Sequence, residues 1–398
     1  MAAAAVLATL VVAALASLFM AWSIGAGSSG STPFAPAVGA NAISVMRAGF
    51  IVGVLGLAGA VLQGANVTEA VGTELVVGSV LTATASTVAL IVAAALVAIG
   101  VFAGYPIATA FTVTGAVVGV GLAAGGGPAI AKYQEIAALW VLTPFVGGGI
   151  AYGTARLLRK KSIPETTAVP ALGGVVGLLV ANIRFAVLGG ESGRSLAEVG
   201  AAVTPPILLP VVGIDLGVAA VSVLFVGVSA ALVRREVVQN LAQGQRRFLL
   251  VLGGLVAFSA GGSQVGLAIG PLVPLLDAVS VPLPALLVGG GLGLLVGSWT
   301  GAPRMIKALS QDYSSLGPRR SIAAMIPSFA IAQTAVALGI PVSFNEIIVS
   351  AIIGSGYAAG GAGVSREKML KTVLAWAGSL GLAFGVAYAA FTGLEIVL

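Results

Sequence analysis

The chain of 398 residues contains no cysteine and no histidine, and only 8% of its residues are charged. The missing cysteines exclude disulfides and thiolate chemistry, and the missing histidines exclude imidazole metal ligands and proton relays. Soluble domains carry roughly 25% charged residues, so a soluble fold is excluded as well. An enzyme without these side chains needs paired acids or an activated serine, and we expect neither an enzyme nor a bound cofactor or metal.

Long stretches without any charged residue occupy much of the chain, and 58% of all residues are hydrophobic. Because a helix needs about 20 mostly apolar residues to cross a bilayer, these stretches predict an all-α polytopic membrane protein. We expect about twelve membrane segments, near residues 4–24, 44–64, 75–99, 104–126, 134–156, 166–188, 206–233, 248–261, 281–300, 321–338, 341–360 and 370–394. Two stretches interrupted by Gly, Ser and Pro, 25–43 and 261–279, are expected to form re-entrant or broken-helix hairpins.

The net charge of +6 does not indicate nucleic acid binding, because the basic residues lie in short loops between apolar runs. They form four clusters, at 156–161, 234–247, 304–320 and 366–371. An even number of expected crossings separates each cluster from the next, so all four can be cytoplasmic. The sequence therefore predicts a multi-pass protein of the cell membrane, with both termini and the loop 189–205 outside.

The two halves of the chain share a repeated pattern. Gly104-Tyr-Pro-Ile matches Gly339-Ile-Pro-Val at an offset of 339 − 104 = 235 residues, and Pro36 matches Pro271 at the same offset. Chance explains any single match in a chain rich in Ala, Gly and Val. Three separated regions that repeat near one offset indicate a duplicated unit instead.

The repeats are expected to be inverted relative to each other. Residues 304–320 are basic, whereas the matching stretch 69–85 contains Glu69 and Glu74 but no Lys or Arg. Opposite loop charge places matching loops on opposite sides of the membrane, which is the arrangement in many alternating-access transporters. The expected organisation is a first inverted repeat over 1–160, connecting membrane helices over 161–238 and a second inverted repeat over 239–398.

The two interrupted stretches carry hydroxyl and amide groups but no charged residue. In inverted-repeat membrane proteins, broken helices of both halves meet near the midplane, where free N–H groups and positive helix ends attract anions. Close packing of helices is the alternative explanation for the same serines and glycines, but the symmetry of the stretches favours a binding role. The candidate donors are Ser28, Ser29 and Thr32 in the first stretch and Ser263 and Gln264 in the second.

These stretches resemble the paired signature of the PiT family of inorganic phosphate transporters, whose usual pattern in each half is Gly-Ala-Asn-Asp-x-Ala-Asn-Ala. The similarity covers nearly the whole chain and includes the run from Val38 to Ser44. The Asn-Asp pair is replaced by Ser28-Ser29 in the first half and by Ser263-Gln264 in the second, so both signature aspartates are missing. In the family these aspartates help to bind coupling cations and phosphate, so their loss affects cation coupling more than anion binding.

A second element of the family, Pro-Val-Ser-Thr-Thr-His, is matched in both halves. It reads Pro106-Ile-Ala-Thr109 in the first half and Pro341-Val-Ser343-Phe-Asn345-Glu346 in the second. The resemblance therefore implies that Thr109, Ser343 and Asn345 contribute a hydroxyl or an amide to the anion site.

Two acidic residues inside expected membrane segments are candidates for coupling to an ion gradient. Glu346 is one, because an ionisable group in a membrane segment is costly and marks a functional site, although a glutamate near a helix end can also reach water. Asp215, about nine residues into the segment 206–233, is expected either to pair with Arg184 or to take part in proton coupling. The coupling ion, sodium or a proton, stays open.

Together these features predict a secondary permease for inorganic phosphate that is ion-coupled and works by alternating access. Neutral donors and helix ends satisfy sulfate as well, so a permease for sulfate or another oxyanion is an alternative, and so is a non-transporting receptor of the same fold. The oxyanion and the lipid bilayer are the expected partners, nucleic acid is not, and a homodimer is left open.

Overall fold

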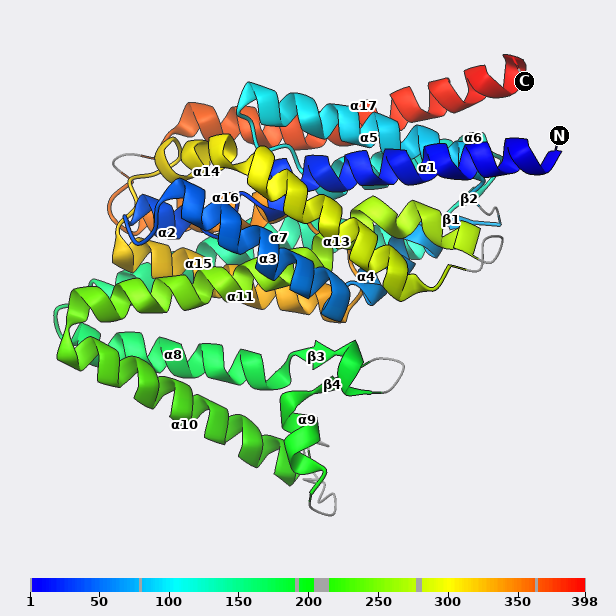
Figure 1. Ribbon diagram of the computed structural model, residues 1–398. Helices are drawn as coiled ribbons and strands as arrows, with labels where there is room; N and C mark the ends of the chain where they lie inside the picture. The colour runs from blue at the N-terminus through cyan, green and yellow to red at the C-terminus, as the bar shows by residue number, and fades with distance from the viewer. Residues whose placement is uncertain are drawn as a thin grey trace.

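Helices form almost all of the described chain (Figure 1), because a backbone in hydrocarbon must satisfy its own N–H and C=O groups. The computed structural model describes residues 2–78, 81–189, 193–203, 215–276, 281–361 and 364–397. Short antiparallel strand pairs are also present: β1 (Val76–Val77) pairs with β2 (Gly127–Pro128), and β3 (Arg184–Phe185) pairs with β4 (Arg194–Ser195).

The α-helices follow one another in chain order. They are α1 (Ala2–Ile24), α2 (Ala35–Gly39), α3 (Val45–Gln63), α4 (Ala65–Thr73), α5 (Ala83–Ala103), α6 (Thr109–Ala123), α7 (Ile130–Leu158), α8 (Glu165–Asn182), α9 (Leu196–Ala201), α10 (Leu216–Gln239), α11 (Leu241–Ile269), α13 (Leu283–Thr300), α14 (Ala302–Gln311), α15 (Pro318–Ala337), α16 (Phe344–Tyr357) and α17 (Arg366–Val397). A π-helical turn, Gly25–Ser29, extends α1, and 3-10 turns cover Ala186–Leu188 and Gly270–Leu275.

Within the described residues, nine helices are long and apolar enough to span a membrane, and the predicted all-α polytopic fold is confirmed. Three of the twelve expected segments are not among these nine: α15, which has 20 residues, and α6 and α16, which are too short to span. α6 has 15 residues and α16 has 14, which is about 22 Å at 1.5 Å per residue, whereas the hydrocarbon core is about 30 Å thick. The expected segments 104–126 and 341–360 are therefore short helices, and both begin among buried residues.

The two interrupted stretches differ from each other. In the first, the π-helical turn ends the helix and the chain turns before α2, as the sequence predicted. In the second, α11 continues unbroken to Ile269 and then tightens into the 3-10 turn from Gly270. The prediction of a hairpin over 261–279 is therefore wrong for 261–269, and residues 277–279 lie outside the described residues.

Each half of the chain packs against the other through the matching helices. α1 packs on α13 and α11 packs on α3, and likewise α6 packs on α17 and α16 packs on α7. Ser86 on α5 donates a hydrogen bond to the carbonyl of Pro271 at 2.5 Å, and Ser321 on α15, 321 − 86 = 235 residues later, donates to the carbonyl of Pro36 at 2.7 Å. A two-fold relation between the halves predicts such reciprocal contacts. The repeat boundaries and the inversion across the membrane stay predictions.

Helices α8 and α10 form a hairpin beside the main bundle, with α9 packed against its end (Figure 1). Both chain termini lie at the same end of the molecule as α9, and the turn between α10 and α11 lies at the opposite end. Asp215 is the N-cap of α10, where its carboxylate accepts hydrogen bonds from the N–H groups of Gly217 and Val218. Asp215 therefore lies at the start of the described helix, and residues 206–214 of the expected segment lie outside the described residues.

Candidate functional site

Three of the residues singled out in the sequence are hydrogen-bonded to one another in the core. Thr109 Oγ1 donates to Gln264 Oε1 at 2.8 Å, and Ser28 Oγ donates to the same oxygen at 3.1 Å. The two hydroxyl oxygens are 3.5 Å apart, and all three residues are fully buried. The π-helical turn after α1, the start of α6 and the C-terminal part of α11 therefore meet at one polar cluster.

Two amide side chains tie this cluster to the backbone around it. Asn345 Nδ2 donates to the carbonyl oxygens of Gly27 at 3.0 Å and Ile107 at 2.6 Å. Gln264 Nε2 donates to the carbonyl oxygen of Val342 at 2.6 Å. Because only an NH₂ group can donate to two carbonyl oxygens, the orientation of the Asn345 amide is determined and its Oδ1 faces the other way as an acceptor.

Helices α6 and α16 both begin at this cluster, after short extended segments. Gly104 and Gly339 start these segments with positive φ angles of 73° and 61°, which favour glycine. Thr109 is the first residue of α6, and Ser343 is the N-cap of α16 without a side-chain capping bond. A helix start leaves N–H groups unsatisfied and carries partial positive charge, so two buried starts suit an anion.

Several buried polar atoms next to the cluster in sequence have no hydrogen-bond partner within the described residues. They are the hydroxyls of Ser29, Ser263 and Ser343, Asn345 Oδ1 and Glu346 Oε2. Buried polar atoms are normally paired, so this concentration indicates the donors and acceptors of a binding site. The hydroxyls can donate to an oxyanion, whereas the amide oxygen and the carboxylate can accept from one.

Two expected site residues make other contacts. Thr32 Oγ1 donates to the carbonyl of Ser28 at 3.0 Å, so it stabilises the turn after α1. Asp215 caps α10, and Arg184 forms its ion pair with Glu198, at 3.0 Å. Among the described residues the predicted pairing of Asp215 with Arg184 is therefore wrong, because the loop after α8 brings a different carboxylate to the guanidinium.

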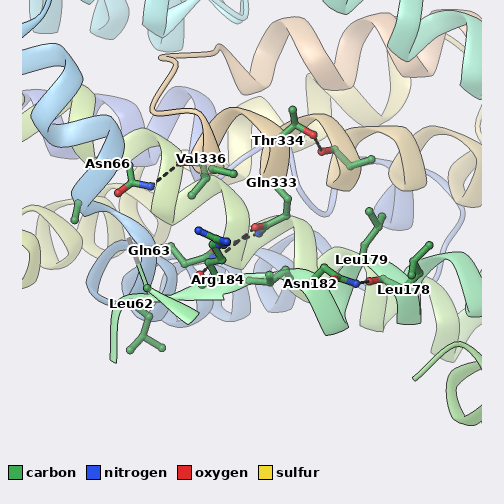
Figure 2. A pocket seen from close by; sticks show the side chains of 15 residues that line it. Leu62, Gln63, Asn66, Leu178, Leu179, Asn182, Arg184, Gln333, Thr334 and Val336 are labelled. Carbon is green, nitrogen blue, oxygen red and sulfur yellow. Dashed lines mark hydrogen bonds between the residues drawn. The ribbon is translucent and has the colours of Figure 1, made fainter. Parts of the chain in front are cut away.

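A cavity that the sequence analysis did not identify lies between α8 and both halves of the bundle, and both apolar and polar residues line it (Figure 2). Its volume is about 520 Å³, and its lining includes Gln63, Asn66, Asn182, Arg184 and Gln333. The available signal was the presence of Gln63 and Gln333 inside the apolar runs 48–68 and 321–345. Polar side chains within membrane helices are costly and mark functional positions.

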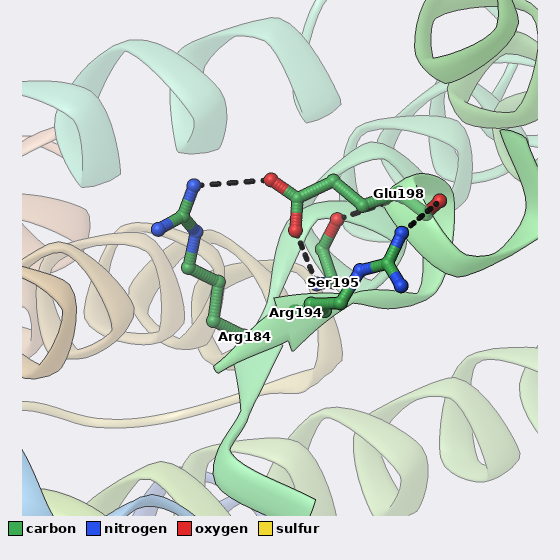
Figure 3. Close-up of polar contacts among 4 residues, drawn as sticks. All are labelled: Arg184, Arg194, Ser195 and Glu198. Atoms are coloured by element: carbon green, nitrogen blue, oxygen red, sulfur yellow. Dashed lines mark hydrogen bonds and ion pairs between the residues drawn. The ribbon is translucent and has the colours of Figure 1, made fainter. Parts of the chain in front are cut away.

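Arg184 is held at this cavity by contacts with the following loop (Figure 3). Its ion pair with Glu198 is flanked by Arg194, whose Nη2 donates to the backbone carbonyl of Glu198 at 3.5 Å. Ser195 and Glu198 also form a capping box at the start of α9. Burial raises the pKa of Glu198, but the Ser195 N–H and the charge of Arg184 outweigh burial and hold this pKa below its ordinary value.

The fold and the cluster together define the class of protein. Polar backbone at the depth of a membrane core is tolerated only where protein or a cavity covers it. Short helices that start at such a place, with their N–H groups directed at a polar cluster, form the substrate sites of secondary transporters. The chain is a multi-pass membrane transporter, and the buried cluster of neutral donors, with Asn345 and Glu346 of α16, is its candidate site.

Known sequences identify the family. The profile of the Phosphate transporter family matches residues 24–387, and the chain belongs to this family, which confirms the resemblance described above. A Thermococcus kodakarensis protein named as a phosphate permease is 26% identical over 379 residues, with 90% of each chain covered. The chloroplastic inorganic phosphate transporter 2-1 of Arabidopsis thaliana is 24% identical over 417 residues, which cover 90% of this chain and 67% of that protein.

A solved structure has the same fold. It is that of a sodium-dependent phosphate transporter, which is 23% identical and superposes with a TM-score of 0.80 over 98% of this chain and 100% of that chain. The agreement confirms the arrangement of helices over nearly the whole chain.

Proposed function

We propose that this protein is a permease that moves inorganic phosphate across the cell membrane by alternating access. Membership of the phosphate transporter family supports phosphate as the substrate. The observation that carries the proposal is the meeting of Ser28, Thr109 and Gln264 at the start of α6, with the start of α16 beside them. Hydroxyls and free helix N–H groups bind an oxyanion there without a fixed cation in the cluster, so the anion can also leave.

The acceptors at the site favour phosphate over sulfate. Asn345 Oδ1 and Glu346 Oε2 are buried, and they have no partner in the described part of the chain. Phosphate keeps at least one proton at neutral pH and can donate it to such an acceptor, whereas sulfate has no proton to donate. Because a buried group left unpaired costs about 1–3 kcal/mol, we expect a preference for phosphate of roughly tenfold or more.

Coupling to an ion gradient is assigned to Glu346. The positions that carry the family's signature Asn-Asp pairs hold serine and glutamine here, and Glu346, 1% exposed in the first turn of α16, is the carboxylate beside the site. A carboxylate in this position can bind sodium together with the nearby hydroxyl oxygens, or it can carry a proton. The solved relative is named as sodium-dependent, which supports sodium, and proton coupling is the alternative.

The proposal includes the cell membrane as the location of the protein. The basic clusters then face the cytoplasm, as the positive-inside rule requires, and the termini face outward. A homodimer is part of the proposal, and α10 is the element that could contact lipid or a second copy. Only 6% of the residues in the most apolar stretch of α10 are buried by the rest of the chain.

Uptake of radiolabelled phosphate and sulfate into proteoliposomes, with and without sodium and proton gradients, tests the function. We expect phosphate uptake that unlabelled phosphate competes more strongly than sulfate does. Gln264→Leu removes the acceptor shared by Ser28 and Thr109 and should abolish uptake, whereas Gln243→Leu, at an exposed position near the start of the same helix, should not. Specific phosphate binding without uptake or counterflow would instead indicate a receptor.

A further inference from the structure

The cavity beside α8 lies between the connecting hairpin and the two halves of the chain. Gln63 and Asn66 come from the end of α3 and the start of α4, Gln333 comes from α15, and Asn182 and Arg184 come from the end of α8 and from β3. Its volume of about 520 Å³ lies within the range of roughly 300–1,000 Å³ that is usual for small-molecule sites. The end of α8 and the strands β3 and β4 lie toward the same end of the molecule as the chain termini (Figure 1).

A pair of amides on the lining of this cavity joins the two halves of the chain. Gln63 Nε2 lies 3.3 Å from Gln333 Oε1, and Gln333 Nε2 donates to Gln63 Oε1 at 3.1 Å. Gln63 Nε2 also donates to the backbone carbonyl of Arg184 at 2.8 Å. Figure 2 shows the two glutamines meeting next to Arg184. Because one glutamine belongs to each half of the chain, a movement between the halves separates them.

A path of polar groups leads from this pair to the buried cluster. Gln333 Nε2 donates to Ser259 Oγ at 2.6 Å. Ser259 lies on α11 one turn before Ser263, whose hydroxyl is buried without a partner in the described residues, and Gln264 follows. Side chains four residues apart on a helix lie on the same face, so Ser259 and Ser263 form successive steps along α11.

The charges around the cavity favour an anion. Among the described residues, Arg184 forms an ion pair with Glu198, and Arg194 donates to the backbone carbonyl of Glu198 (Figure 3), so the side chains of these three residues together carry a charge of +1. The depressed pKa of Glu198 is consistent with the guanidinium being this close. An arginine can bind an oxyanion through two parallel N–H groups, and amides of asparagine and glutamine can donate to the remaining oxygens.

We propose that this cavity is the outer vestibule in which an oxyanion first binds, with Arg184 as the attracting charge, and that the Gln63–Gln333 pair is the gate between the vestibule and the buried cluster. The inference rests on the proposed function and identifies the route by which phosphate reaches that site. When the halves move apart, the amides exchange their mutual hydrogen bonds for bonds to the passing anion, so that no buried donor is left unpaired.

The absence of native cysteine makes the vestibule testable by thiol labelling. Asn66→Cys and Thr334→Cys place a thiol on its lining, and Glu135→Cys places one at an exposed position on α7 outside it. With a membrane-impermeant methanethiosulfonate added from the side of the termini, we expect all three to react. Saturating phosphate should slow the two vestibule thiols several-fold and leave the Glu135→Cys thiol unchanged.

Two substitutions of the ion pair separate an electrostatic role from a structural one. Arg184→Gln should raise the KM for phosphate about tenfold, the factor expected for one charge-assisted hydrogen bond, with kcat little changed. Glu198→Gln keeps a side chain that can complete the capping box, removes the negative charge and should lower the KM. If the ion pair only maintained the shape of the loop, both substitutions would raise the KM for phosphate.

The gate is tested by the labelling rate of a thiol placed at the buried cluster. In a Ser263→Cys background the thiol is buried behind the glutamine pair, and adding Gln333→Ala should increase its rate of labelling from the side of the termini several-fold. An unchanged rate would overturn the gate. If phosphate does not change the labelling rate of the vestibule thiols in a protein that still takes up phosphate, the vestibule is refuted and the proposed function stands. Failure of the cysteine-free protein to take up phosphate would instead refute the proposed function.

Discussion

The indole Nε1 of Trp140 donates a hydrogen bond of 2.9 Å to the backbone carbonyl of Pro341. Trp376, at the matching position of the second half, donates one of 2.8 Å to the carbonyl of Pro106, which matches Pro341. Each half thus anchors, through a buried tryptophan, the extended segment that starts the short helix of the other half. The positions of α6 and α16 at the site are therefore coupled to helices α7 and α17.

Replacement of either tryptophan by phenylalanine should destabilise the protein. Trp140→Phe and Trp376→Phe each leave a buried proline carbonyl without its donor, which costs about 1–3 kcal/mol. Thermal unfolding in detergent should show a lowered midpoint of similar size for both, because the two contacts are equivalent. Tyr152→Phe loses only an exposed hydrogen bond with Arg156 on the same helix as Trp140 and serves as the control. A large effect of one tryptophan alone would count against the two-fold relation.

The close contact between short and long helices should be sensitive to a single methyl group. A Cβ added to Gly354 on α16 would lie 2.1 Å from the carbonyl oxygen of Gly148, and one added to Gly119 on α6 would lie 2.5 Å from that of Phe384. Gly354→Ala and Gly119→Ala should therefore lower stability by about 1–3 kcal/mol. At Gly149 nothing lies within 4 Å of an added Cβ, so Gly149→Ala should be neutral or slightly stabilising in the same unfolding measurement.

The membrane class could be predicted from the sequence, whereas the repeat boundaries and the role of the site residues stay predictions. Apolar length determines which helices can span, and a shared offset survives divergence of single residues. Ser28 and Gln264 were predicted from the matched interrupted stretches and Thr109 from the resemblance to the family's second element, and the structure brings all three into direct contact.

The break expected at residues 261–269 could not be judged from the sequence, because glycine serves two purposes in membrane helices. Here it allows close packing: a Cβ on Gly261 would lie 1.9 Å from the carbonyl of Gly56, and one on Gly266 would lie 2.6 Å from the backbone nitrogen of Thr68. The Gln63–Gln333 pair was missed for a different reason. Its partners are not at matching repeat positions, so only the folded chain brings them together.

A negative charge at Ser29 should weaken phosphate binding. The Ser29 hydroxyl is buried next to Ser28 and has no partner among the described residues, so a carboxylate there would face the bound anion at short range and low dielectric. In sodium-free transport assays, Ser29→Asp should raise the KM at least about tenfold. Ser29→Asn has nearly the same size without the charge and should change the KM much less. Equal KM values for the two variants would show that charge at this position does not matter to the anion.

The buried carboxylate of Glu346 should decide whether transport is driven by a gradient. It is 1% exposed in the first turn of α16, next to Asn345, which bonds the backbone of the first half, and its Oε2 has no partner within the described chain. A cation or a proton at this carboxylate would offset its negative charge next to the anion, so the coupling ion and the anion would cross together. Glu346→Gln keeps the shape and removes the charge. We expect this variant to exchange phosphate across the membrane but no longer to accumulate it.

Two assays on the same proteoliposomes separate these outcomes. Counterflow of labelled phosphate against unlabelled phosphate inside needs only the anion site and should persist in Glu346→Gln. Accumulation under an imposed sodium gradient, and separately under a proton gradient, should fall to the level seen without any gradient, and the gradient that drives the unaltered protein identifies the coupling ion. Glu135→Gln, at an exposed position on α7, controls for loss of a carboxylate as such. If Glu346→Gln accumulates phosphate as well as the unaltered protein does, the driving ion is bound elsewhere, and the uncharged oxygens of Ser29, Ser263 and Ser343 become the ligands to test.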